Sequence, residues 1–154
     1  MSDRIFNIEN VSLDDIKITK ASLENRMISN IHVDIKSLEI SYGFEGAINT
    51  DHKLVKVTFW CNIESSNKEE GESVLNGHYN IDFLYKVQDL ENWTYRSEGQ
   101  TFIQADALVP LANISYSTAR GIIYNRCLGT LLDKFILPIL PTHELYDFFP
   151  GNTP

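Results

Sequence analysis

Apolar and polar residues alternate along much of the first half of the chain, a pattern typical of half-buried β-strands. The clearest run ends at Val87, with Leu84 as the one apolar residue in its outward set. Its inward residues are Tyr79, Ile81, Phe83, Tyr85 and Val87, and its polar outward residues are His78, Asn80, Asp82 and Lys86. Residues 54–63 alternate in the same way, with Val55 facing inward and Trp60 outward. Strands with one wet face predict an antiparallel sheet.

Two earlier stretches also alternate, residues 31–35 and residues 38–44, but the second is one residue out of step with the first. A slip at Lys36–Ser37 would change the buried face, so the pattern predicts a bulge or bend there. Residues 5–19 predict a first strand or pair of strands. Residues 21–30 have no clean period and predict a connection.

Three polar or glycine-containing stretches predict the links between strands and helix. GFEGAINTDH, residues 43–52, predicts a loop because of its glycines, Asn and Asp. ESSNKEEGE, residues 64–72, predicts an acidic hairpin connection. QDLENWTYRSEG, residues 88–99, predicts a connector that holds a helical turn.

Residues 104–129 form the long run with helical periodicity, because small or apolar residues recur at spacings of three and four. Gly129 suits the left-handed position after a helix, and Pro110 predicts either a helix start or a kink. The apolar residues 131–137 fit strand, loop or helix. Thr142 predicts the N-cap of a short terminal helix. Strands followed by helices indicate an α+β fold in one domain, residues 1–154.

Composition narrows the function classes. Of the 154 residues, 43% are hydrophobic and 22% charged, an ordinary globular balance. The net charge of −8 argues against binding to nucleic acid or to anionic membranes. The sequence predicts no signal peptide and no membrane span, and Cys61 and Cys127 are expected as reduced thiols. We therefore expect a cytoplasmic protein.

The sequence holds no motif of a known catalytic or metal site. Its four histidines stand singly, at positions 32, 52, 78 and 143, without a partner His or Cys at ligand spacing. It has no phosphate-binding loop, no G-x-S-x-G and no H-E-x-x-H. We therefore expect neither an enzyme nor a cofactor.

Apolar and aromatic residues stand where a small domain is normally polar. Tyr42 and Phe44 lead into the predicted loop, and Trp60 and Leu84 lie on the faces expected to be wet. The tail over residues 135–149 is rich in aromatic and aliphatic residues. Some of them must fill the core, and the rest indicate a second chain, either a subunit or a ligand.

Three stretches give the chain a familiar pattern. The helix contains NISYSTAR, with Asn113, Ile114, Tyr116, Ala119 and Arg120, and the tail contains ILPTHELYDF. The opening FNI followed by Asp15-Ile16 completes the pattern. In order and spacing the chain resembles the SecB family of protein-export chaperones.

The resemblance implies a four-stranded antiparallel sheet covered on one face by a long helix and a short C-terminal helix. It also implies an ATP-independent holdase, assembled as a homotetramer (a dimer of dimers), that binds unfolded polypeptides in apolar grooves for protein export or to protect an antitoxin. The residues placed in the groove are Tyr42, Phe44 and Ile48 of the loop between strands two and three, Tyr116 of the helix, and Leu140, Leu145 and Phe148 of the tail.

The implied partners are unfolded clients and a SecA-type motor or an antitoxin. The outward residues Trp60, His78, Asp82 and Leu84 would form the partner-docking face, with His78 where the family has an acidic residue. A second hypothesis is a small non-catalytic binding module of the same fold, which holds a defined protein partner or an apolar ligand. Tyr79, Phe83 and Tyr85 would line its pocket if the helix stood off the sheet.

Overall fold

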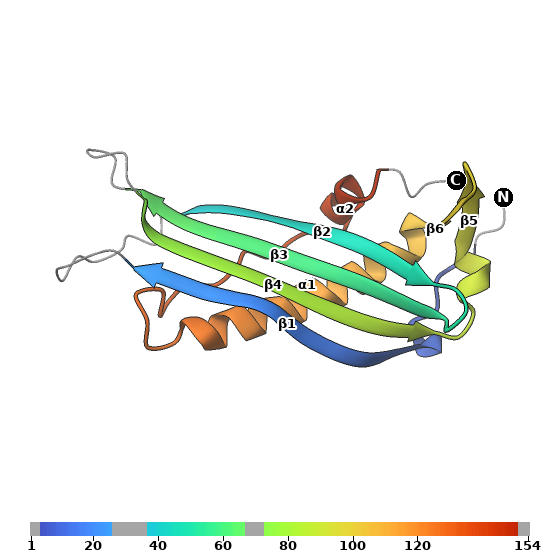
Figure 1. The fold of residues 1–154 in the computed structure, drawn as a ribbon, viewed down its shortest axis with the longest axis horizontal. Helices are drawn as coiled ribbons and strands as arrows, with labels where there is room; N and C mark the ends of the chain where they lie inside the picture. Colours follow the sequence, from blue (N-terminus) through green and yellow to red (C-terminus); the bar gives the residue numbers. More distant parts are fainter. Residues whose placement is uncertain (1–3, 26–36, 67–72, 151–154) are drawn as a thin grey trace.

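The computed structural model of the chain describes residues 4–25, 37–66 and 73–150. A four-stranded antiparallel sheet, in the order β1-β4-β3-β2, carries a long helix on one face (Figure 1). The elements are β1 (Val11–Asn25), β2 (Glu39–Asn49), β3 (Leu54–Ser66), β4 (Ser73–Val87), β5 (Thr94–Ser97), β6 (Gln100–Ile103), α1 (Ala105–Cys127) and α2 (Thr142–Leu145). The α+β prediction and its four-stranded sheet are confirmed.

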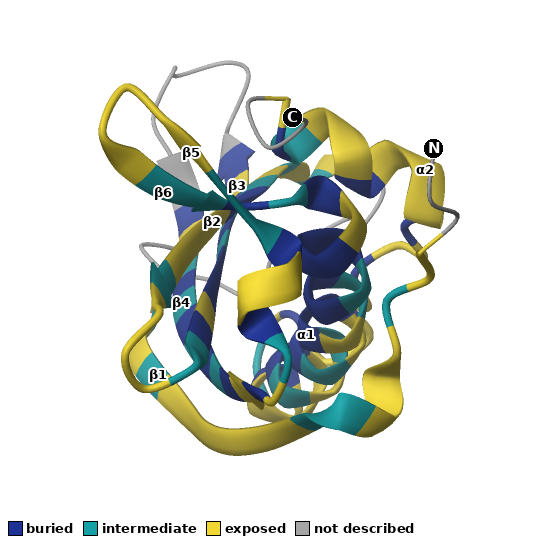
Figure 2. Ribbon diagram, turned by 90° about the vertical axis from the view of Figure 1, so that its right-hand side faces the viewer, coloured by how far each residue is buried: buried dark blue, intermediate teal, exposed yellow. Residues whose placement is uncertain are grey.

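The two central strands follow the predicted alternation. β3 and β4 pair in register, so that Val57 lies opposite Phe83 and Phe59 opposite Ile81. These inward side chains are fully buried, while the outward positions of β4 are half-buried or exposed. In Figure 2 the buried positions gather in the central strands and in α1, and β1, the β5–β6 hairpin and α2 are largely exposed.

The loop predicted over residues 43–52 is wrong for residues 43–49, which belong to β2. The strand continues to Asn49, and only residues 50–53 turn, with Lys53 in a left-handed conformation at φ 55°. The glycines that suggested a loop are strand positions where a neighbouring side chain comes close. A Cβ on Gly43 would lie 2.6 Å from the Trp60 indole, and one on Gly46 would lie 2.9 Å from a Leu108 methyl carbon.

β1 begins and ends later than the strand predicted over residues 5–19, and residues 5–10 are not part of it. It runs as one strand from Val11 to Asn25, so residues 21–25 belong to the strand and not to a connection. Register shifts between Leu13 and Asp15 and between Ile18 and Lys20 move the inward face twice. Such bulges break strict alternation, which is why the sequence pattern was weak here.

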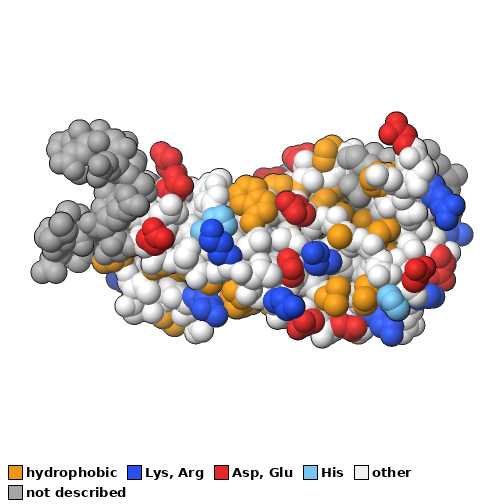
Figure 3. All heavy atoms as spheres, viewed as in Figure 1, with side chains coloured by type: hydrophobic (Ala, Val, Ile, Leu, Met, Phe, Trp, Pro, Cys, Tyr) orange, Lys and Arg blue, Asp and Glu red, His pale blue; other side chains and the backbone are white. Residues whose placement is uncertain are grey.

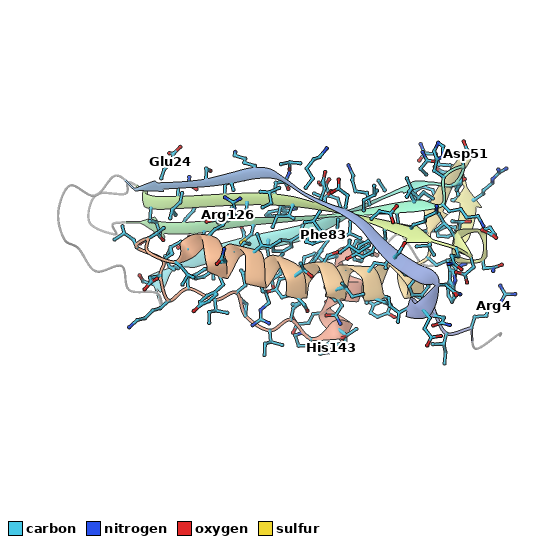
Figure 4. The ribbon with its side chains drawn as sticks, turned by 90° about the horizontal axis from the view of Figure 1, so that it is seen from below. Arg4, Glu24, Asp51, Phe83, Arg126 and His143 are labelled. Carbon is cyan, nitrogen blue, oxygen red and sulfur yellow. The ribbon has the colours of Figure 1, made fainter. Side chains whose placement is uncertain are left out.

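α1 lies directly on the sheet and matches the helix predicted over residues 104–129. The Tyr85 hydroxyl lies 2.8 Å from the Ser115 hydroxyl, which itself donates to the Leu111 carbonyl at 2.8 Å. Nearer the end of the helix, the Tyr79 hydroxyl lies 3.7 Å from the Cys127 Sγ. In Figure 4 the labelled Phe83 points into the layer between sheet and helix. The helix does not stand off the sheet.

The connector over residues 88–99 holds the predicted helical turn, a 3₁₀ turn at Leu90–Trp93. It also begins a hairpin, β5–β6, that was not predicted. Glu98 and Gly99 form its turn with φ of 52° and 80°, and Tyr95 stacks on Phe102 at 5.6 Å between ring centroids. No helix in the described part of the chain has both the length and the apolar character of a membrane span.

Some predictions fall outside the described residues. These are the strand over residues 31–35, the Lys36 side of the predicted bend at Lys36–Ser37, and residues 67–72 of the predicted acidic connection. The first three residues of that connection, 64–66, belong to β3.

Candidate functional site

Six aromatic rings from four parts of the chain meet beside β2, and we call them the aromatic cluster. They are Tyr42 and Phe44 of β2, Phe59 of β3, Tyr116 of α1, and Phe148 and Phe149 near the C-terminus. Phe44 is the centre, with ring centroids 5.3 Å from Phe59 and 5.1 Å from Phe148. Such tilted and edge-on arrangements are favourable for aromatic pairs. The cluster joins the sheet, the helix and the tail.

β2 supplies two rings to the cluster because its inward side chains continue in alternation. Ile40, Tyr42, Phe44 and Ile48 all pack against the core, and Gly46 occupies the intervening inward position. Without a side chain at Gly46, Leu108 of α1 can approach the strand closely. β2 is an edge of the sheet, so the aromatic cluster lies at that edge.

Residues 135–149 cross the helix and close over the aromatic cluster, and we call them the C-terminal strap. Residues 135–141 have no regular secondary structure, and their buried residues alternate as Phe135, Leu137 and, after two exposed positions, Leu140. The strap then forms α2 and a 3₁₀ turn at Tyr146–Phe148. Pro141, and not the predicted Thr142, is the N-cap residue of α2, and no side chain caps it.

Two side chains of α1 hold the extended part of the strap by hydrogen bonds. Tyr116 Oη donates to the Pro138 carbonyl at 2.8 Å, and Arg120 Nε donates to the Leu137 carbonyl at 2.9 Å. The donors are four residues apart, so they lie on one side of the helix. Among the described residues, no other hydrogen bond reaches residues 136–140.

The seven predicted groove residues lie in and around this closed arrangement. Those with less than a tenth of their surface exposed are Phe44, Tyr116, Leu140 and Leu145, and those that are half-buried are Tyr42, Ile48 and Phe148. Six of the seven belong to the aromatic cluster or to the strap that covers it, and they pack on one another. Ile48 lies further along β2, opposite Val55. Within one chain these residues fill the space between β2 and α1.

Burial also affects the protonation of the two tyrosines. It raises the pKa of Tyr116 far above its ordinary value; nearby Tyr42 adds to the rise, and Arg120 opposes it. Burial raises the pKa of Tyr42 as well, followed by the Glu144 carboxylate. Both hydroxyls therefore keep their protons at neutral pH, and Tyr116 remains a hydrogen-bond donor.

The four predicted docking residues share the outer face of the sheet, where Figure 3 shows charges of both signs among small apolar patches. Trp60 and Leu84 are half-buried there, and Trp60 lies over Gly43. Asp82 accepts a 2.7 Å hydrogen bond from the Thr58 hydroxyl. Partial burial lowers the pKa of His78, and the nearby Lys20 lowers it further.

Part of this outer face is hollowed. Asp15, Lys17, Lys56, Asp82 and Leu84 line a shallow depression of about 110 Å³. The Lys56 Nζ lies 3.9 Å from a carboxylate oxygen of Asp82. The depression therefore mixes both charge signs with one apolar wall, and it lies on the side of the sheet opposite the aromatic cluster.

Large apolar side chains also remain exposed on the side of α1 that faces away from the sheet. Ile114, Tyr124 and Leu128 have 37%, 40% and 46% of their surface exposed. Ile136 and Ile139 of the strap have 57% and 80% exposed. Gly121, on the same side of the helix, would meet no neighbour with an added Cβ. An uncovered apolar face of this size is typical of an interaction surface.

Three residues of the site escaped sequence reasoning. The alternation over residues 54–63 gives Phe59 no role of its own, and Phe149 is one of many apolar residues in the tail. Arg120 enters the sequence argument only as a residue of NISYSTAR that carries the resemblance. Its spacing of four from Tyr116 was the available signal, but the sequence does not reveal that two carbonyls lie opposite.

No metal centre is formed within residues 4–25, 37–66 and 73–150, where no three His, Cys, Asp or Glu side chains gather suitably. Burial raises the pKa of the Cys61 thiol to about 12, and the nearby Cys127 adds to the rise. Such a thiol is a poor nucleophile at neutral pH.

Comparison with known proteins gives a structural likeness but no sequence match. No protein-family model and no curated sequence matches the chain. The fold is similar to the Mycobacterium tuberculosis SecB-like chaperone Rv1957, solved in complex with a ChAD peptide from the Rv1956 HigA1 antitoxin. The TM-score is 0.53 at 16% identity, over 86% of this chain and 92% of that one.

A Streptococcus agalactiae protein of unknown function is also similar, with a TM-score of 0.43 at 9% identity. That likeness covers 85% of this chain and 97% of the other, and it is too distant to support an argument. The four-stranded sheet, the long helix across it and the short C-terminal helix together make this a SecB-like fold.

Proposed function

We propose that the protein is an ATP-independent holdase chaperone, a single SecB-like domain that binds unfolded polypeptides on apolar surface. The observation that carries this proposal is the aromatic cluster at the edge strand β2, covered by a partly extended apolar segment of the same chain. The strap supports the proposal, because it is an apolar segment that packs on the cluster. A client would contact Tyr42, Phe44, Ile48 and Tyr116 in place of the strap, and the displaced strap would border it with Leu140, Leu145 and Phe148.

The chemistry of such a site suits unfolded chains. Buried apolar area contributes roughly 25 cal/mol per Å², so a few aromatic contacts supply several kcal/mol without sequence specificity. The edge of a sheet also offers unpaired backbone groups to an extended segment. The net charge of −8 favours basic clients over acidic ones.

Assembly as a homotetramer in the cytoplasm belongs to the same proposal. The exposed apolar side chains of α1, Ile114, Tyr124 and Leu128, supply a surface that a second copy would cover. On β1, Leu13 and Ile16 are exposed at the other edge of the sheet, where a further copy would extend it. Closed symmetry is the rule among soluble homo-oligomers.

Two kinds of partner fit the proposed holdase. The Mycobacterium tuberculosis neighbour is bound to an antitoxin peptide, which supports an antitoxin as the partner of this chain. Protein export with a SecA-type motor is the other role, with docking on Trp60, His78, Asp82 and Leu84. At neutral pH the lowered pKa of His78 leaves that position without charge, so such docking would rest on Asp82 and the apolar pair.

The first test is the mass of the protein in solution by light scattering, alone and with reduced, alkylated α-lactalbumin, which cannot refold. We expect four chains that form a stable complex with this unfolded probe and none with native α-lactalbumin. Ile114→Asp should lower the mass, whereas Ser41→Asp, exposed on β2, should not. A monomer that ignores the unfolded probe would exclude the holdase.

The ligand-binding alternative gains no support from the inner sheet face. Tyr79, Phe83 and Tyr85 are buried under α1, and the tyrosine hydroxyls contact Cys127 and Ser115 of the helix. These contacts place the three side chains in the packed layer between sheet and helix.

A further inference from the structure

We infer that Tyr116 and Arg120 form a latch that holds the C-terminal strap on the aromatic cluster and so sets how often that cluster is open to a client. This inference rests on the proposed function and deepens it. It makes the two side chains positioning residues, whose contribution to client binding is exerted through the strap. Tyr116 then has a second role besides lining the groove.

The first observation is how few hydrogen bonds hold residues 136–140, where Leu137 and Leu140 are buried but the backbone makes no other hydrogen bond to the part of the chain that the structure describes. Within the described chain, residues 136–140 receive hydrogen bonds from Tyr116 and Arg120 alone, at the adjacent carbonyls of Leu137 and Pro138. Pro138 has no N–H to offer in return. A strand of the sheet, by contrast, is held at nearly every residue by its neighbours.

The second observation is what the strap covers. Phe148 lies 5.1 Å from Phe44 and 5.9 Å from Tyr42, and Phe149 lies 6.2 Å from Phe44. These contacts belong to the strap, so its departure would uncover the β2 side of the aromatic cluster. The surface left behind would be apolar and would border the free edge of β2. An unfolded segment with aromatic side chains is the occupant that matches it.

The third observation is that the strap resembles a client in chemistry. Residues 135–149 include Leu137, Leu140, Leu145 and three phenylalanines, and residues 135–141, before α2, have no regular secondary structure. A client therefore competes with a segment of similar apolar character. When a binding-competent state is a minor fraction of the population, the apparent Kd rises by the inverse of that fraction. Weakening the latch should thus strengthen client binding.

The side chains of the latch can be removed without disturbing the layer between sheet and helix. Tyr116→Phe deletes one oxygen and keeps the ring in the cluster, and Arg120→Gln acts on a half-buried side chain outside the core. One lost hydrogen bond changes an equilibrium about fivefold. We therefore expect each substitution to lower the Kd for client about fivefold. Tyr95→Phe on β5 and Arg126→Gln, exposed on α1, lie outside the surfaces proposed for clients and for assembly and are the matched controls.

The experiment measures the affinity of each variant for fluorescent reduced, alkylated α-lactalbumin by anisotropy. In parallel, amide hydrogen exchange is followed in peptides that cover residues 135–149, with circular dichroism and light scattering to verify fold and mass. We expect Tyr116→Phe and Arg120→Gln to bind the probe more tightly and to exchange faster in the strap. The control variants should behave like wild type in both measurements.

A purely structural role for these side chains predicts weaker or unchanged binding, so either result in a folded variant would overturn the latch. Unchanged exchange in the strap would also overturn it. If no form of the protein binds the probe, the proposed function fails. In that case the amide hydrogen exchange of residues 135–149 still shows whether Tyr116 and Arg120 hold the strap.

Discussion

Substitution of Gly43 tests whether this glycine of β2 leaves the space that the indole ring of Trp60 occupies. A Cβ built on Gly43 would lie 2.6 Å from Cζ2, 2.7 Å from Cε2 and 2.8 Å from Nε1 of Trp60. These are atoms of a rigid ring, so either the indole must rotate or β2 must shift. We therefore expect Gly43→Ala to destabilise the fold by about 1–3 kcal/mol, the range for overpacking.

Gly77 provides the matched control on β4. A Cβ there would have its nearest neighbours at 3.5 Å, an ordinary van der Waals contact, and Gly77 has no left-handed φ. Gly77→Ala restricts the unfolded chain, so we expect it to be neutral or stabilising by up to about 1 kcal/mol. For a chain of this length, 1 kcal/mol corresponds to roughly 2–4 °C in Tm.

A double-mutant cycle with Trp60→Val isolates the steric contact. In that background Gly43→Ala should cost close to nothing, giving a coupling energy of about 1–3 kcal/mol. The measurement is urea unfolding by circular dichroism at one fixed chain concentration, because assembly would make stability depend on concentration. An equal cost of Gly43→Ala in both backgrounds would refute the indole contact, as would a Gly77→Ala cost of the same size.

Three further predictions concern buried or partly buried groups. Because burial raises the pKa of Cys61 to about 12, its thiol should react with Ellman's reagent only after unfolding. Burial and then Lys20 lower the pKa of His78, so the unfolded chain binds a proton more readily. Stability should therefore fall as pH drops below about 6.5, and less steeply in His78→Asn. Tyr85→Phe and Ser115→Ala each disturb the buried hydroxyl pair and should cost about 1 kcal/mol in urea unfolding.

Each of these three predictions would be contradicted by a specific result. Labelling of Cys61 in the folded chain at the rate of the unfolded chain would contradict its burial. Identical pH dependence in wild type and His78→Asn would remove His78 as a source of acid sensitivity. If Tyr85→Phe and Ser115→Ala both leave the urea midpoint unchanged, the hydroxyl pair contributes nothing to the docking of α1 on the sheet.

The strongly periodic elements were predictable from sequence, and the irregular ones were not. β3 and β4 repeat their buried positions without interruption, so their faces follow from the pattern alone, and α1 is recognisable as a helix by its period. The alternation of apolar and polar residues fails to predict β1 because the register shifts twice, between Leu13 and Asp15 and again between Ile18 and Lys20. The hairpin β5–β6 has strands of four residues, which is too short for a period to appear.

β2 shows how glycine misleads local reasoning. Gly43 and Gly46 matched a loop, yet both are strand residues whose missing side chains admit Trp60 and Leu108. The inward alternation through Tyr42, Phe44 and Ile48 was present in the sequence, with Gly46 at the intervening position. A close approach between elements is a tertiary property, so no reading of neighbouring residues separates it from a turn.

Four aromatic residues of the predicted groove were predictable as a group, but their arrangement was not, and their role in binding clients stays a prediction. Resemblance identified Tyr42, Phe44, Tyr116 and Phe148, which the structure brings together in one cluster. That the cluster is covered by the chain's own strap depends on a turn after α1 and on the course of residues 135–141, which have no period of their own.

Residues of α1 within NISYSTAR point in three directions around the helix axis and contact different parts of the protein. Ser115 and Ala119 face the sheet and are fully buried, whereas Tyr116 and Arg120 reach the strap from the next side of the helix. Ile114 faces away from the sheet, toward the surface proposed for assembly. Because these directions are distinct, a change on the strap side can alter how the site opens without altering the layer of helix on sheet. Tyr116→Phe should therefore change client affinity in a chain that remains fully folded.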